Sequence, residues 1–204
     1  MAAVVIAARR TLQPGPPRAD RAAVAVAPRA RRALVWLPEG ETLHNSLVSA
    51  FARFGVRAGA FQLLGGYLSS AVYHVAVPRD ESVRAAEYGP PIQIEGGARL
   101  VRATGSYGED LSGLPLLHIH GVLAEPTGRA YGGHVNPLLC VVGPGGVRAN
   151  LLLTVGFKQV VDRETRYSLF FPYSEVTAHV PVHHSRDQHW SRGERALGAE
   201  RGSA

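Results

Sequence analysis

Cysteine is almost absent from this 204-residue chain, which contains a single one, Cys140. One thiol cannot form an intrachain disulfide, so we expect the protein to fold in a reducing compartment, in this case the cytoplasm. Cys140 lies inside the apolar stretch 138–142. That setting predicts a small core residue rather than a reactive nucleophile.

Long apolar runs are also missing, since no stretch approaches the length of a membrane span. The first eight residues are apolar, but Arg9 and Arg10 follow them, which is the reverse of the order in a secretory signal. Residues 1–33 contain no serine, unlike a typical organelle transit peptide. We therefore expect a protein without a membrane partner.

The sequence lacks the motifs of several large enzyme classes. It contains no Gly-x-Ser-x-Gly elbow, no phosphate-binding loop and no dinucleotide fingerprint. The corresponding hydrolases, nucleotide-binding enzymes and dehydrogenases therefore have no support in this chain.

Acidic residues are outnumbered, with 16 Asp and Glu against 22 Lys and Arg, and the net charge is +6. Residues 1–33 contain seven arginines and one acid, Asp20, and they account for the whole excess. This segment also contains the run Pro14-Gly15-Pro16-Pro17, and its apolar residues do not recur at the spacing of a helix or a strand. It predicts a disordered basic arm over residues 1–32, to which a DNA partner would be attracted first.

The centre of the chain, residues 33–176, predicts one α+β domain, followed by an irregular polar tail over 177–204. Glu41 and Thr42 open one helix and Gly55 closes it, with one face formed by Leu43, Leu47, Phe51 and Phe54. The other apolar stretches are short and separated by turns, which predicts a mostly antiparallel sheet of seven or eight strands packed with this helix. Trp36, in the first strand, is expected in the core.

Three histidines form the most informative pattern. His118 and His120 are two residues apart in the apolar run 116–124, so in a strand both imidazoles leave the same face. Turn residues follow, and His134 comes directly after two glycines. Three neutral imidazoles that converge would bind Zn²⁺ or another divalent metal and leave one coordination position open. The alternative is that each histidine is simply a hydrogen-bonded polar residue.

Other residues near this block are candidates for ligand binding. Arg57 and Arg129 could hold an anionic ligand beside the histidines, or they could form salt bridges at a surface or interface. Tyr131 could direct its hydroxyl towards the site, or it could serve in packing. Four more histidines in the predicted tail could bind metal adventitiously: His179, His183, His184 and His189.

Read in order, these blocks resemble the PPC domain family (plant- and prokaryote-conserved, also PCC). The resemblance covers roughly residues 34–171, and its most specific part is the segment from Leu116 to His134. Further matching blocks are residues 54–59, 63–71, Gly89-Pro90 and 104–106.

The resemblance implies a small α+β domain that assembles as a homotrimer and has a binding or regulatory role with DNA or protein partners. Plant members carry an AT-hook with a Gly-Arg-Pro core, which this chain lacks, so it resembles the bacterial type. Arg99 stands where the plant interaction motif has a glutamate. That departure argues against a plant-type protein partnership.

A small-molecule metalloenzyme that uses the same histidines is the alternative. The spacing from His118 and His120 to Glu125 and Gly132 fits the first cupin motif, but Ala149 stands where the second motif needs a histidine. A metal-dependent hydrolase would also need a general base, for which the sequence offers Glu95, Glu109 and Asp110.

Overall fold

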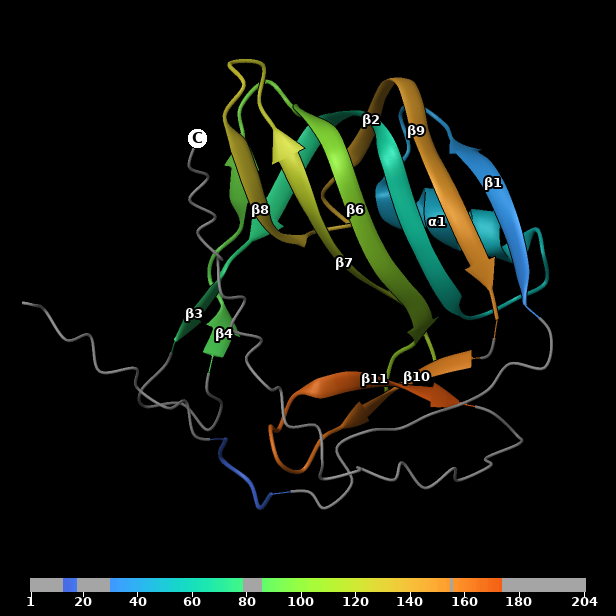
Figure 1. Ribbon diagram of the computed structural model, residues 1–204, viewed down its shortest axis with the longest axis vertical. Helices are drawn as coiled ribbons and strands as arrows, with labels where there is room; N and C mark the ends of the chain where they lie inside the picture. Colours follow the sequence, from blue (N-terminus) through green and yellow to red (C-terminus); the bar gives the residue numbers. More distant parts are fainter. Residues whose placement is uncertain (1–12, 18–29, 79–85, 155, 174–204) are drawn as a thin grey trace, which may run out of the picture.

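A computed structural model of the protein describes residues 13–17, 30–78, 86–154 and 156–173 (Figure 1). These residues contain one helix and eleven strands, so the predicted combination of one helix with a sheet is confirmed, although the strands outnumber the seven or eight expected. The elements in chain order are β1 (Arg31–Leu37), α1 (Leu43–Ala52), β2 (Gly59–His74), β3 (Ala76–Pro78), β4 (Ala86–Tyr88), β5 (Ile92–Ile94), β6 (Ala98–Glu109), β7 (Pro115–Ala124), β8 (Ala130–Val135), β9 (Val141–Leu153), β10 (Gly156–Val161) and β11 (Ser168–Tyr173).

Nine of these strands form one sheet, in the order β1-β9-β2-β8-β7-β6-β10-β11 with β5 paired to β2. The small pair β3-β4 stands apart (Figure 1). The sheet is mixed rather than purely antiparallel, because β10 runs parallel to β6 where Lys158 pairs with Glu109. The other strand pairs of the described residues are antiparallel.

Strand β2 organises the sheet, since it pairs with β9 and β6 and, near its end, with β8. Its register against β9 shifts around Gly66, whose φ of +144° is a backbone conformation that favours glycine. The strand therefore continues through Gly65 and Gly66. Because β2 meets β8 as well as β6, the segment β6-β7-β8 curves back onto β2.

Helix α1 begins where the sequence predicts but ends at Ala52, so Phe54 lies beyond it. The Thr42 side chain accepts a hydrogen bond from the Asn45 backbone N–H at 3.1 Å, which satisfies one of the free donors of the first turn. Leu43, Leu47 and Phe51 are fully buried. The helix therefore covers one face of the sheet with its apolar side. It lies against β1 and β9, and the Phe51 ring packs on Phe61 of β2 and Tyr107 of β6.

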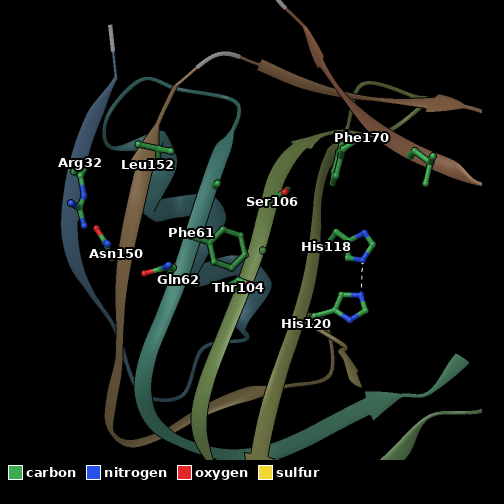
Figure 2. A pocket seen from close by; sticks show the side chains of 13 residues that line it. Arg32, Phe61, Gln62, Thr104, Ser106, His118, His120, Asn150, Leu152 and Phe170 are labelled. Atoms are coloured by element: carbon green, nitrogen blue, oxygen red, sulfur yellow. Dashed lines mark hydrogen bonds between the residues drawn. The ribbon is translucent and has the colours of Figure 1, made fainter. Parts of the chain in front are cut away.

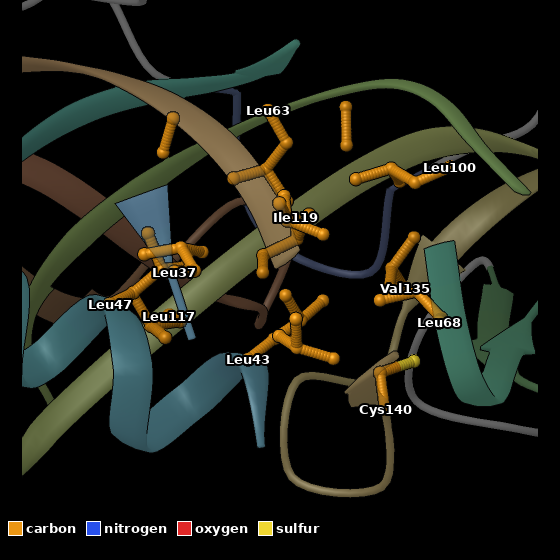
Figure 3. Close-up of a cluster of buried hydrophobic side chains, with 14 of the residues drawn as sticks. Leu37, Leu43, Leu47, Leu63, Leu68, Leu100, Leu117, Ile119, Val135 and Cys140 are labelled. Atoms are coloured by element: carbon orange, nitrogen blue, oxygen red, sulfur yellow. The ribbon is translucent and has the colours of Figure 1, made fainter. Parts of the chain in front are cut away.

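The hydrophobic core lies on the face of the sheet that α1 covers (Figure 3). On β7, Leu117, Ile119 and Leu123 are buried while His118 and His120 are exposed, which is the alternation of a half-buried strand. Cys140 is fully buried, as predicted, and its Sγ lies 3.2 Å from the Val72 N–H. Burial raises the pKa of this thiol to about 11, which keeps it protonated.

The opposite face of the sheet is open. The prediction that Trp36 belongs to the core is wrong, because its side chain is on this face and is 61% exposed. Its Nε1 donates to the Gly145 carbonyl at 3.0 Å, and the Arg148 guanidinium lies 6.0 Å from its ring centroid. The position in β1 puts Trp36 on the alternate face from the buried Leu37.

Parts of the predicted basic arm are described. Arg31 and Arg32 begin β1, and the Gly15 N–H donates to the Glu164 carbonyl at 2.8 Å. The remaining arm residues and the predicted tail from residue 177 lie outside the described residues. Among the described residues, no helix combines the length and the apolar character needed to cross a membrane.

Candidate functional site

The structure brings His118, His120 and His134 together on the open face. One nitrogen from each ring is within 4.8 Å of the other two, and the Nε2 atoms of His118 and His120 are 2.9 Å apart. The ring centroids are separated by 4.9–5.4 Å. His118 and His120 share a face of β7, and His134 on β8 is the direct cross-strand partner of His120. We call these three residues the histidine triad.

Gly133 explains why glycine precedes His134. A Cβ atom at this position would lie 2.5 Å from the His74 carbonyl oxygen and 2.9 Å from the Tyr73 ring. Only glycine therefore lets β8 approach β2 closely enough for His134 to pair with His74. A Cβ atom at Gly132 would have its nearest neighbouring atom 3.8 Å away, so that glycine has no such steric role.

The triad favours neutral imidazoles. The His118 side chain is partly desolvated although it lies at the surface, and this desolvation, followed by the neighbouring His120, lowers its pKa below 6.5. Burial and three neighbouring histidines lower the pKa of His134 to about 4. At neutral pH these two rings therefore carry a free lone pair, which is the form that binds a metal ion.

A second layer of side chains holds His134 in place. The Tyr88 hydroxyl lies 3.2 Å from His134 Nδ1, and the two rings are stacked with centroids 4.4 Å apart. In the tautomer with the proton on Nδ1, this nitrogen donates to the Tyr88 oxygen and Nε2 of His134 is free to accept a proton or bind a metal ion. Hydrogen bonds of this kind to the outer nitrogen fix the orientation of histidine ligands.

His74 lies beside the triad but is already occupied by other partners. Its Nδ1 donates to the Gly89 carbonyl at 3.0 Å. The Asn136 side-chain oxygen accepts from two backbone N–H groups, so its amide nitrogen is the atom 3.2 Å from His74 Nε2. Both ring nitrogens of a neutral His74 are thereby used, so this residue supports His134 rather than supplying a fourth ligand. Sequence reasoning missed His74 and Tyr88, since neither has a short spacing to the triad.

The donor set of the triad suits a divalent ion of intermediate softness such as Zn²⁺. In catalytic or ligand-binding zinc sites, three imidazole nitrogens lie about 2.0–2.1 Å from the zinc ion and one coordination position stays open. Such an ion could polarise a bound water or hold an oxygen atom of a ligand.

A groove of about 910 Å³ adjoins the triad on the open face (Figure 2). It extends from Arg32 on β1 to His118 and His120 on β7, and Leu169 and Phe170 of β11 also line it. We call this cavity the histidine groove.

The other predicted ligand-binding residues lie outside the histidine groove. The exposed Arg57 side chain forms an ion pair with Glu109 at 3.5 Å. The Arg129 guanidinium lies 5.2 Å from the centroid of the Tyr131 ring. Tyr131 contacts the buried Tyr73, donates to Glu125 at 3.2 Å, and extends from β8 on the face opposite to His134.

The candidate general bases are also elsewhere. Glu109 pairs with Arg57, Asp110 accepts two backbone hydrogen bonds in its own turn, and Glu95 follows β5. Within the described part of the chain, no carboxylate lines the histidine groove. The hydrolase alternative therefore lacks a general base among these residues.

Comparisons with known proteins agree with this fold. The chain has 20% identity to a metal-containing protein from Archaeoglobus fulgidus, with a TM-score of 0.56 over 69% of this chain and 93% of that one. For a plant- and prokaryote-conserved (PPC) protein from Pyrococcus horikoshii the identity is 19% and the TM-score 0.56, over 74% and 99% of the two chains. A proposed DNA-binding protein from Ralstonia eutropha shows 18% identity and a TM-score of 0.53, over 68% and 89%. No curated protein matches the chain at a significant level.

The sequence itself also matches a known family. The profile of the Plants and Prokaryotes Conserved (PCC) domain covers residues 25–149, which is more than half of the chain and includes the whole triad. The resemblance seen in the histidine and glycine blocks is thereby confirmed, and the chain belongs to the PCC domain family.

Proposed function

We propose that this protein binds one divalent metal ion, Zn²⁺ in the first instance, through His118, His120 and His134. The observation that carries the proposal is the convergence of three ring nitrogens within 4.8 Å. The lowered pKa values of His118 and His134 support it, because a metal competes with protons for the same lone pairs. A structurally similar protein from Archaeoglobus fulgidus contains a metal.

Titration of the demetallated protein with zinc tests this role. We expect one tight site per chain, and we expect His120→Ala to remove it. The tail histidines provide the matched control, because a variant with His183 and His184 replaced by alanine should retain the tight site. Equal zinc affinity of the wild type and His120→Ala would show that the triad is not the metal site.

A second role, DNA binding through the basic arm, is favoured by the concentration of positive charge in residues 1–33. The structurally similar protein from Ralstonia eutropha is a proposed DNA-binding protein. The arm would contact phosphates, so the protein would act as a binding or regulatory protein with little base readout of its own.

The test replaces the arm arginines that precede β1 and leaves Arg31 and Arg32 in the strand. These residues are Arg9, Arg10, Arg18, Arg21 and Arg29. Their replacement by glutamine should weaken DNA binding and reduce the slope of log K against log salt by about 0.9 for each lost phosphate contact. An unchanged affinity and slope would exclude the arm.

We also propose a homotrimer, on the basis of the family resemblance, and a cytoplasmic location, on the basis of the single cysteine. Leu34 and Trp36 on the sheet edge at β1 are 70% and 61% exposed, and an apolar surface of this kind is compatible with association. A light-scattering mass of three chains is expected. The mass of a single chain would reject the trimer.

A further inference from the structure

We infer that the histidine groove binds an elongated organic anion, with a metal-binding head at the triad and an anionic tail on Arg32. This inference rests on the proposed metal site and adds the class of ligand that the site would take. The juxtaposition that carries it is a row of side chains across five strands, with His118 and His120 of the triad at one end and Arg32 at the other (Figure 2).

The strand register defines this row. Arg32 pairs with Leu152, Leu152 with Ala60, and Ala60 with Ser106. Ser106 in turn pairs with His118. Cross-strand partners project from the same face, so all five residues lie on the open face. Four strand spacings separate the Cα atoms of Arg32 and His118 by roughly 19 Å along the sheet, which requires an elongated ligand.

The middle of the groove offers neutral hydrogen-bonding groups. Asn150, Gln62 and Thr104 form a second row that ends at His120, and Ser106 lies beside them. The Gln62 side-chain oxygen accepts from Arg102 at 3.3 Å. Asn150, Thr104 and Ser106 line the groove with an amide and two hydroxyl groups that can donate hydrogen bonds to a ligand.

The charge balance favours an anion. Arg32 is the one permanently charged side chain among the described residues that line the groove, and no carboxylate compensates it. A divalent ion held by three neutral imidazoles would add two further positive charges at the opposite end. A ligand with an oxygen donor at its head and a carboxylate or phosphate at its tail would complement both ends.

Apolar side chains complete the lining. Leu152 is 40% exposed and Leu169 is 38% exposed, and both border the groove together with Phe170. Such surfaces suit the aliphatic or aromatic middle of a small molecule, with the polar groups fixing its orientation. A linear chain with polar ends therefore fits this surface.

The test uses a defined probe, a series of straight-chain hydroxamic acids of increasing length that end in either a carboxylate or a methyl group. Binding to the zinc-loaded protein is measured by calorimetry for the wild type, Arg32→Gln, His120→Ala and Arg53→Gln. Arg53 is the matched control, because it follows α1 on the covered side of the sheet and does not line the groove.

We expect carboxylate-ended probes to bind best at one chain length, about tenfold or more tighter than their methyl-ended analogues. Arg32→Gln should abolish this difference without weakening the methyl-ended probes, which also shows that the variant is folded. Arg53→Gln should change nothing, and His120→Ala should abolish binding of both series.

Two outcomes would overturn the inference in distinguishable ways. In the first outcome, methyl-ended probes bind only when His120 is present, but a terminal carboxylate adds no affinity, or the affinity that it adds persists in Arg32→Gln. The anionic tail site is then wrong, and the metal site stands. If the wild type and His120→Ala bind all probes equally, or neither binds zinc or probe, the proposed metal site fails as well.

Discussion

His120 on β7 and His134 on β8 are direct cross-strand partners, and His134 is in turn paired with His74 on β2. The triad is therefore a product of strand register, because each ring is placed by backbone pairing rather than by a flexible loop. Residues that maintain this register should control metal affinity even where they do not touch the metal.

The first prediction concerns the approach of β8 to β2. Gly133→Ala would place a methyl group 2.5 Å from the His74 carbonyl oxygen, so β8 has to move and His134 moves with it. We expect a loss of about 1–3 kcal/mol in the free energy of unfolding and a lower zinc affinity. Denaturant unfolding and zinc titration measure the two effects.

Gly132→Ala is the matched control for this change. A Cβ at that position finds its nearest neighbour 3.8 Å away, which is an ordinary contact. Zinc affinity should therefore stay at the wild-type level. Equal losses in the two variants would mean that the close approach at Gly133 does not position the triad.

The second prediction concerns the hydrogen bond to the outer nitrogen of His134. Tyr88→Phe keeps the stacked ring and removes the hydroxyl that lies 3.2 Å from His134 Nδ1. Zinc affinity should fall about 10–100-fold while the fold is preserved. Tyr131→Phe also removes a phenolic hydroxyl, but Tyr131 lies on the face of β8 opposite to His134, so this variant should leave zinc affinity unchanged. A larger effect of Tyr131→Phe would restore Tyr131 as a site residue.

The third prediction is a pH dependence of the zinc-free protein. The pKa of His134 is lowered from 6.5 to about 4 by burial and by its histidine neighbours, so the unfolded chain binds this proton more readily than the folded chain. The stabilising contribution of neutral His134 is complete above pH 6.5 and is lost as the pH falls towards 4.

Denaturant unfolding between pH 7.5 and 4 measures this loss. His134→Gln has no proton to gain at this position, so its free energy of unfolding should fall less over the same range. An identical fall in the variant and the wild type would show that His134 is not held in its neutral form by the fold.

Local patterns predicted much of the fold and of the triad. The helix could be placed from Thr42, Leu43 and Gly55, because capping and the 3.6-residue period depend on neighbours in sequence. His118 and His120 could be placed on one face because strand alternation is equally local. Gly133 preceding His134 was a usable signal for close approach, since glycine lets a neighbouring backbone come closer than any residue with a Cβ atom.

Long-range pairing decided what the sequence did not predict. His74 comes close to His134 because β2 pairs with β8, a contact between residues 60 positions apart that no short spacing encodes. Tyr88 reaches His134 from β4, which pairs with β3 directly after β2. Trp36 is apolar but lies on the open face, because consecutive residues of a strand point to opposite faces and the next residue, Leu37, is the buried one. Arg57 has its carboxylate partner in Glu109 at the far end of β6, so its charge alone could not place it.

The central claim is that one metal ion is bound by all three histidines of the triad. Anomalous diffraction from crystals of the zinc-loaded protein tests it most directly. We predict one strong zinc peak per chain at about 2.0–2.1 Å from a ring nitrogen of each of His118, His120 and His134. Zinc found elsewhere, with no peak between these three rings, would contradict the account.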